Sequence, residues 1–139
     1  MLSAEEELFQ LARRGRLAAV RAENQSKGTV LATRVILSTA LPDRVRGLLG
    51  RPALEPGEGL WIVPCSGVHT VGMTYPIDVL HLDKWQHVVL ALHAVPPNWH
   101  PPAGTCRTAV RARTYTVLEL PAGTLAQSNT EVGDQIAVR

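Results

Sequence analysis

The sequence has few of the features that mark whole classes of protein. Only 2 of its 139 residues are cysteines, too few for the disulfide framework of a small secreted scaffold. No apolar run approaches the roughly 18 residues that a membrane-spanning helix needs. The first residues, Met1 to Glu7, are acidic where a signal peptide has basic and then apolar residues. We therefore expect a cytoplasmic protein with reduced thiols and no membrane span.

An excess of charge of one sign is also missing. Lys and Arg together number 14 and Asp and Glu 12, and this balance argues against nucleic acid as the main partner. Hydrophobic types make up 45% of the residues, which excludes a disordered chain and is enough for one core. No GxGxxG, Walker, HExxH or CxxC motif occurs anywhere. The composition predicts a single domain over 1–139 and does not identify its chemistry.

Short strands separated by turn signals dominate the chain. β-branched and leucine-rich runs predict strands over residues 17–23, 29–38, 60–63, 77–82, 87–95, 115–120 and 134–138. Short helices are expected over about 4–14, after Pro42, and within 123–128. Four prolines between 96 and 102 predict a stiff surface loop that carries Trp99. We predict a mainly β fold, a β-sandwich or partly open barrel, with two or three short helices.

One segment, 64–79, concentrates side chains whose chemistry exceeds what packing needs. Cys65, His69 and Met73 stand four residues apart, and thiolate, imidazole and thioether together favour copper or zinc. Four residues of strand span about 13 Å, however, far more than the separation of two ligands of one ion. We therefore predict that the protein holds no stoichiometric zinc or copper, and that a side-chain or backbone acceptor holds His69.

Cys65 and His69 could also act as a thiolate nucleophile and its base. The same distance argument applies, and the sequence names no third residue to orient the base. A small buried cysteine is therefore the preferred interpretation. A redox pairing of Cys65 with Cys106 stays open, because the sequence does not give their distance in space.

Asp78 lies between apolar residues on a predicted strand. It would share a strand face with Leu80 and Leu82, which is a poor place for a bare carboxylate. It is either a general base or ligand group, or a structural carboxylate that accepts hydrogen bonds from backbone amides or a hydroxyl such as Thr70 or Thr74. We favour the structural interpretation and expect Asp78→Ala to cost about 1–3 kcal/mol by orphaning those donors.

A long stretch between Lys84 and Leu118 contains no acidic residue. Its scattered lysine and arginine residues could form an anion- or nucleic-acid-binding face on which Trp99 stacks. These basic residues are thinly spread, so a solvated arginine face is the preferred interpretation.

Several short motifs in this chain resemble, in the same order, those of the domain of unknown function 192 family. They are Arg46-Gly47-Leu48-Leu49-Gly50-Arg51, Gly57-Glu58-Gly59-Leu60, His69-Thr70 with Met73, Pro76-Ile77-Asp78-Val79, Leu82-Asp83, Val117-Leu118-Glu119-Leu120-Pro121-Ala122-Gly123 and Val132-Gly133-Asp134. The resemblance covers about residues 29–139 and leaves the helix and hairpin strand of 1–28 outside. It implies a compact, mostly β, sandwich-like fold in a bacterial or archaeal protein, with no established activity.

The chain departs from the family pattern in two places. Val71 and Thr74 stand where relatives often carry an aromatic and a basic residue, which weakens any anion site there. Residues 84–87 replace a common Asp-Gly turn, so we expect a looser hairpin with Trp85 exposed.

Two hypotheses from different classes remain open. In the first, the chain is a non-enzymatic accessory domain, without a cofactor, that binds a small ligand or a protein partner. Its candidate site residues are Cys65, His69, Thr70, Met73, Asp78 and Trp99. In the second, it is a metal-binding protein or a hydrolase-like enzyme that uses Cys65, His69 and Asp78. An enzyme needs such groups to converge in a pocket, and the sequence contains no recognisable catalytic set, which favours the first hypothesis.

Overall fold

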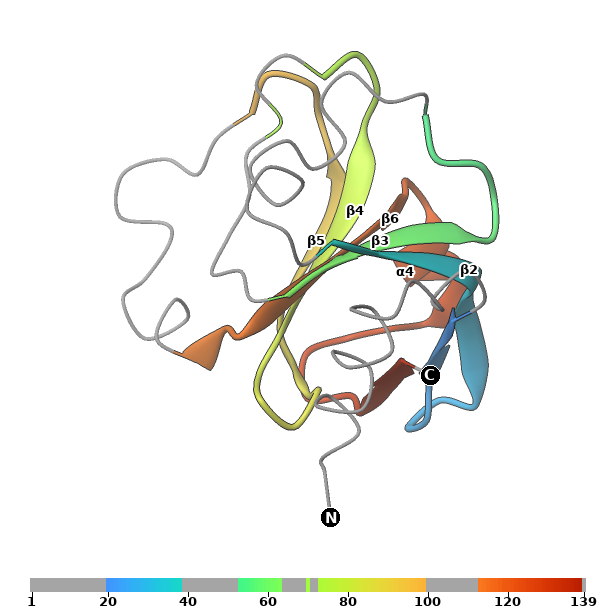
Figure 1. The fold of residues 1–139 in the computed structure, drawn as a ribbon, viewed down its shortest axis with the longest axis vertical. Coiled ribbons are helices and arrows are strands. Elements are labelled where there is room, and N and C mark those ends of the chain that lie inside the picture. The colour runs from blue at the N-terminus through green and yellow to red at the C-terminus, as the bar shows by residue number, and fades with distance from the viewer. Residues whose placement is uncertain (1–19, 39–52, 64–69, 71–72, 100–112, 139) are drawn as a thin grey trace.

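The strands of the protein form one seven-stranded sheet, seen in a computed structural model (Figure 1). The structure describes residues 20–38, 53–63, 70, 73–99 and 113–138. The strands are β1 Val20–Asn24, β2 Thr29–Ser38, β3 Glu58–Ile62, β4 Ile77–Leu82, β5 Val88–Val95, β6 Thr116–Pro121 and β7 Ile136–Val138. Their spatial order is β5-β4-β6-β3-β2-β1-β7, and every pair is antiparallel except β2 with β3. Helix α4, Thr124–Ser128, lies beside β2 (Figure 1).

The sheet curls until the two strands at its ends approach each other. His87, just before β5, forms an antiparallel bridge with Gln135, just before β7. The Val88 amide donates to the Asp134 carbonyl at 2.9 Å, and the Gly133 amide donates to the Val88 carbonyl at 2.8 Å. Register shifts within β1–β2 and β4–β5 mark bulges, which bend strands and increase their twist. The result is a partly open barrel.

Alternate residues of the central strands supply two separate cores, because successive strand side chains point to opposite faces. The inner core lies inside the curl and is built from Ala22, Leu31, Ala32, Val35, Trp61, Val63, Leu80, Leu82, Val88, Leu118, Leu120, Leu125, Ile136 and Val138. The outer core lies on the other face of β3 to β6 and comprises Leu60, Ile62, Met73, Ile77, Val79, Val95 and Val117. Strands β4 and β6 are therefore covered on both faces.

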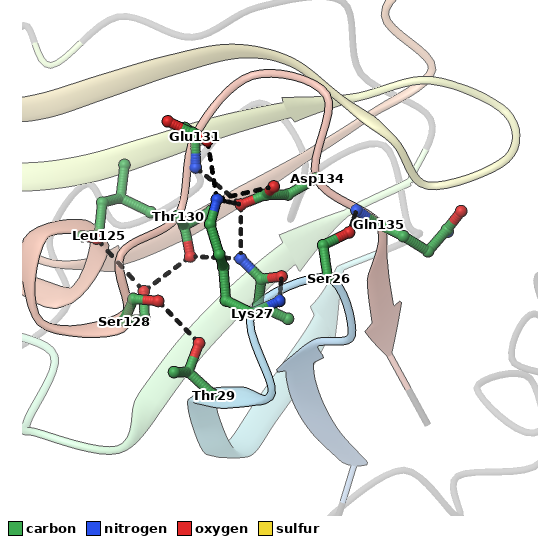
Figure 2. Close-up of polar contacts among 10 residues, drawn as sticks. Ser26, Lys27, Thr29, Leu125, Ser128, Thr130, Glu131, Asp134 and Gln135 are labelled. Carbon is green, nitrogen blue, oxygen red and sulfur yellow. Dashed lines mark hydrogen bonds and ion pairs between the residues drawn. The ribbon is translucent and has the colours of Figure 1, made fainter.

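A polar network ties the β1–β2 hairpin to the connection between α4 and β7 (Figure 2). The Asp134 carboxylate accepts hydrogen bonds from Asn24 Nδ2 at 2.9 Å, from Lys27 Nζ at 3.2 Å and from the Glu131 amide at 3.0 Å. Lys27 Nζ also donates to the Glu131 carboxylate at 2.8 Å, and Asn24 Nδ2 donates to Thr130 Oγ1 at 3.0 Å. The network thus links the first strands of the barrel to the last.

The charges in this network shift each other's proton affinity. Burial raises the pKa of Asp134, but the hydrogen bonds from Asn24, the Glu131 amide and Lys27 together hold that pKa below its ordinary value. The hydrogen bond to Glu131 raises the pKa of Lys27, with partial offset by burial and further support from Asp134. The network therefore works with Asp134 ionised.

The variant Asp134→Asn is expected to lower the free energy of unfolding by about 1–2 kcal/mol at pH 7, because the amide loses charge-assisted hydrogen bonds. A depressed folded-state pKa stabilises the fold above the unfolded pKa of 3.8 and ceases to do so as the pH falls through the folded value. Urea titrations at pH 7 and pH 3 measure the difference. The control Glu131→Gln changes a side chain that is 71% exposed and should cost below about 0.5 kcal/mol. Equal losses of unfolding free energy in Asp134→Asn and Glu131→Gln would contradict the conclusion that the ionised Asp134 stabilises this network.

The predicted strand pattern agrees closely with the structure. Strands 29–38 and 77–82 have the predicted bounds. Strand β3 begins at Glu58, two residues earlier than predicted, and β7 begins at Ile136, two residues later than the predicted strand 134–138. Trp85 is exposed as expected, at 72%. The expected helices over 4–14 and after Pro42 lie outside the described residues, so of the predicted helices only α4 is confirmed.

The sandwich alternative is not confirmed, whereas the partly open barrel agrees with the structure. The seven strands of the described residues belong to one sheet, because the parallel pairing of β2 with β3 joins the β1–β2–β7 half to the β3–β6–β4–β5 half. No helix within the described parts of the chain is long and apolar enough to cross a membrane.

Candidate functional site

The outer face of β4 and β6 carries two buried ionisable side chains. His81 of β4 and Glu119 of β6 are each 3% exposed. The register pairs Val79 with Glu119 and His81 with Val117, so the two ionisable residues occupy diagonal positions on one face. Diagonal neighbours have Cβ atoms about 7–8 Å apart or somewhat less, within reach of long side chains. Packing alone does not require ionisable groups beside an apolar cluster.

His81 is a neutral group at physiological pH. Burial lowers the pKa of His81 to about 4, because desolvation penalises the charged imidazolium. Its Nδ1 lies 3.3 Å from Thr114 Oγ1. A neutral imidazole has one donor and one acceptor nitrogen. His81 therefore offers directional hydrogen bonding on this face rather than a positive charge.

Thr70 holds the beginning of the proline loop against the outer core. Its Oγ1 donates to the Pro96 carbonyl at 2.6 Å and accepts from the Trp99 amide at 2.7 Å. Its backbone amide donates to the Trp99 carbonyl at 2.7 Å, and its carbonyl accepts from the Asn98 and Met73 amides at 2.9 and 3.0 Å. Met73 belongs to the outer core and Trp99 packs against it. The structure thus brings together three of the predicted site residues.

Asp78 points to the other face of β4, toward the inner side of the barrel. It is fully buried, and its carboxylate accepts from the Ala94 amide through Oδ1 and from the Leu125 amide through Oδ2, each at 2.8 Å. The predicted structural interpretation, a carboxylate bonded to backbone amides, is confirmed. The alternative partners, the hydroxyls of Thr70 and Thr74, are not required, because each carboxylate oxygen accepts a backbone amide.

Each of these two amides lies where the local backbone provides no other partner. Leu125 is in the first turn of α4, where helical amides have no partner within the helix, and the N-cap Gly123 makes no side-chain cap hydrogen bond. Ala94 has φ 47 and lies in the bulge where the β4–β5 register shifts between Ile77 and Val79. Asp78 therefore fixes both a strand bulge and a helix start.

Two of the candidate residues, Cys65 and His69, lie outside the described residues, so their proposed roles stay predictions. The pairing of Cys65 with Cys106 also lies outside them. Among the residues that the structure does describe, no group of three or more His, Cys, Asp and Glu side chains is placed to hold a metal ion.

Sequence reasoning singled out neither His81 nor Glu119. Their signal was present, because strict alternation places His81 on the same strand face as Ile77 and Val79. Glu119 lies between Leu118 and Leu120, so alternation places it on the strand face opposite theirs. It is buried because the sheet is covered on both faces at β6.

A sequence profile of the domain of unknown function 192 family, described as uncharacterized ACR, matches residues 22–138. The chain belongs to this family. The match begins at Ala22, so most of β1 lies within the domain of unknown function 192 region, which the sequence resemblance alone placed from about residue 29 onward. This agrees with the position of β1 between β2 and β7 in the sheet.

Two crystal structures have a similar fold. A protein of unknown function from Novosphingobium aromaticivorans DSM 12444 is 21% identical, with a TM-score of 0.66 over 86% of this chain and 83% of that one. A candidate transcription regulator from Sinorhizobium meliloti 1021 is 20% identical, with a TM-score of 0.66 over 86% of this chain and 91% of that one. No curated protein matches the chain. At these identities the likeness shows the fold alone.

Proposed function

We propose that this chain is a non-enzymatic binding protein whose ligand site lies at the covered outer face of β4 and β6. The observation that carries the proposal is the placement of Glu119 and His81 at diagonal positions on neighbouring strands, both buried beside the apolar outer core. Ligand sites combine an apolar lining with a few placed polar groups, and this face contains both kinds of group. Met73 and Trp99 supply apolar contact, and Cys65 and His69 remain proposed members of the site.

The chemistry of this face favours a small ligand that donates hydrogen bonds or carries a positive charge. Glu119, Thr114 and His81 place a carboxyl, a hydroxyl and a neutral imidazole group on this face, and His81 Nδ1 lies 3.3 Å from Thr114 Oγ1. A carboxylate pairs best with an ammonium or guanidinium group.

The hydrolase-like alternative names Cys65, His69 and Asp78, and the buried His81 adds no effective general base to it. A general base works best when its pKa is near the working pH. The pKa of His81 is about 4, which makes it a weak base at neutral pH but leaves its hydrogen-bonding capacity intact. Asp78 serves the site indirectly, through the strand bulge on the opposite face of β4.

Thermal unfolding in the presence of ethanolamine, putrescine and methylguanidine, with inorganic phosphate and citrate as anionic comparisons, tests the proposal. A cationic compound at ten times its Kd should stabilise the fold by about 1.4 kcal/mol, which raises the Tm by several degrees. The isosteric variant Glu119→Gln should lose this shift, while the exposed control Glu131→Gln should keep it.

Two results would contradict the proposed site. One is stabilisation by phosphate or citrate in place of the amines, and the other is an unchanged shift in Glu119→Gln whose circular dichroism spectrum matches the wild type. Hydrolysis of p-nitrophenyl acetate that disappears in Cys65→Ala or His69→Ala would move the protein to the hydrolase-like class.

A further inference from the structure

The first half of β2 has a strand on one side only. Strand β1 pairs with β2 from Thr29 onward, whereas β3 pairs with it only from Arg34, opposite Glu58. Residues 29–33 of β2 therefore have no neighbouring strand, among the described residues, on the side away from β1. An unpaired strand edge presents backbone amides and carbonyls that another extended chain can bind.

A groove of about 450 Å³ runs along this open edge. One wall is the open half of β2, and the facing wall is the end of β6 and helix α4. The lining residues are Thr29, Val30, Leu31, Ala32, Thr33, Pro56, Gly57, Pro121, Ala122, Thr124, Gln127 and Ser128. The groove occupies the place that β3 would fill if it began several residues earlier, and it is of the size of small ligand sites.

Two hydrogen bonds define the length of the open edge. At one end Thr29 Oγ1 donates to the Ser128 carbonyl at 2.7 Å, and at the other the Thr33 amide donates to the Gly57 carbonyl at 2.9 Å. Between them lie Val30, Leu31 and Ala32, at most about 10 Å of strand, which bends where the β1–β2 register shifts opposite Ala22 and Glu23. Half of the backbone groups of a strand point to each of its edges. The groove can therefore pair with about three residues of an extended chain.

The lining excludes several classes of ligand. The described residues that line it include no charged side chain to select an anion or a cation, and no aromatic ring on which a nucleobase could stack. What it offers is hydroxyl groups, the amide of Gln127, and the backbone edge of β2. Main-chain hydrogen bonding with modest side-chain selection is the way in which domains bind peptides by strand addition.

From these observations we propose that the groove is a peptide site, which binds a short uncharged segment of another protein as an added strand beside residues 29–33 of β2. The open half of β2 supplies the backbone hydrogen bonds, and the neutral, hydroxyl-rich wall admits small uncharged side chains. This site is independent of the proposed ligand site at His81 and Glu119, which lies on the outer face of β4 and β6.

The test uses the full chain labelled with ¹⁵N and an N-acetylated, C-amidated pentapeptide of alternating threonine and valine. Amide shifts should be saturable and confined to residues 29–33 and 121–128, with a Kd near or below about 1 mM. The same peptide methylated at alternate backbone nitrogens should not bind, because it cannot donate hydrogen bonds to the strand edge. Ala122→Trp fills the groove and should weaken binding at least tenfold, whereas Ala126→Trp, exposed on α4 outside the groove, should not.

Each alternative outcome overturns the proposal. If amide shifts are absent up to 5 mM peptide, or if the methylated peptide binds equally well, the peptide does not bind as an added strand. Shifts at the same residues caused by maltose and not by the peptide indicate a carbohydrate site. Shifts there that grow with protein concentration alone, with a dimer in sedimentation, indicate that a second copy of this chain occupies the edge. The ligand site at His81 and Glu119 is unaffected by any of these results.

Discussion

Replacing Asp78 by alanine is expected to lower the free energy of unfolding by about 2–5 kcal/mol. The side chain is fully buried, and both of its oxygens accept backbone amides at 2.8 Å. Removal leaves the Leu125 amide buried without a partner, which costs about 1–3 kcal/mol, while the amide of the exposed Ala94 loses a partly buried hydrogen bond worth about 1–2 kcal/mol. The expected loss exceeds the 1–3 kcal/mol inferred from sequence because two separate elements depend on one carboxylate. Urea or guanidinium titration followed by circular dichroism measures it.

Two further variants make this expectation specific. Asp78→Asn keeps one acceptor oxygen but turns an amide group toward a backbone donor, so it should lose most of the same stability. Thr74→Ala, at an exposed position in the same segment, should change the stability by less than about 0.5 kcal/mol. An Asp78→Asn protein as stable as the wild type would show that only one oxygen accepts a hydrogen bond.

Acidification from pH 6.5 to pH 4 is expected to lower the stability of the protein by about 2–3 kcal/mol through His81. Burial lowers the pKa of His81 from 6.5 to about 4 in the folded state. Between these two values the unfolded chain binds a proton that the folded chain does not, so stability falls as the pH falls across this range. Each pH unit corresponds to about 1.4 kcal/mol. Urea titrations at pH 7, 5.5 and 4 measure the effect.

A pair of histidine variants isolates this source of acid sensitivity. His81→Leu, which cannot titrate, should flatten the stability profile between pH 6.5 and 4, whatever its effect at pH 7. His93→Leu, which removes an exposed histidine, is the matched control. If His81→Leu retained the wild-type slope, the buried imidazole would not be the group that resists protonation.

The candidate site was predictable only in part, and particular residues show why. Thr70, Met73 and Trp99 were grouped from sequence, and the structure joins Thr70 to Trp99 through paired hydrogen bonds. Asp78 was placed in the same group by its nearness in the chain, yet it points to the opposite face, because alternate residues of a strand diverge. Nearness in sequence therefore predicts a shared segment but not a shared surface.

The sequence by itself determined the local structure of this protein. Runs of β-branched residues set the strands, the turn before β5 exposes Trp85, and the apolar surroundings of Asp78 required a bonded carboxylate. These properties depend on a residue and its near neighbours, whose preferences for strand, turn or buried hydrogen bond act wherever the segment lies.

Only the tertiary structure decided which strands are neighbours. The parallel pairing of β2 with β3 begins at Arg34 and so leaves half of β2 open, and the pairing of β4 with β6 brings His81 and Glu119 to one face. The alternation of side chains along a strand predicts which residues share a face. It does not predict which other strand pairs with that strand. That choice is made by the burial of two cores at once, a property of the whole sheet, and both proposed binding sites follow from it.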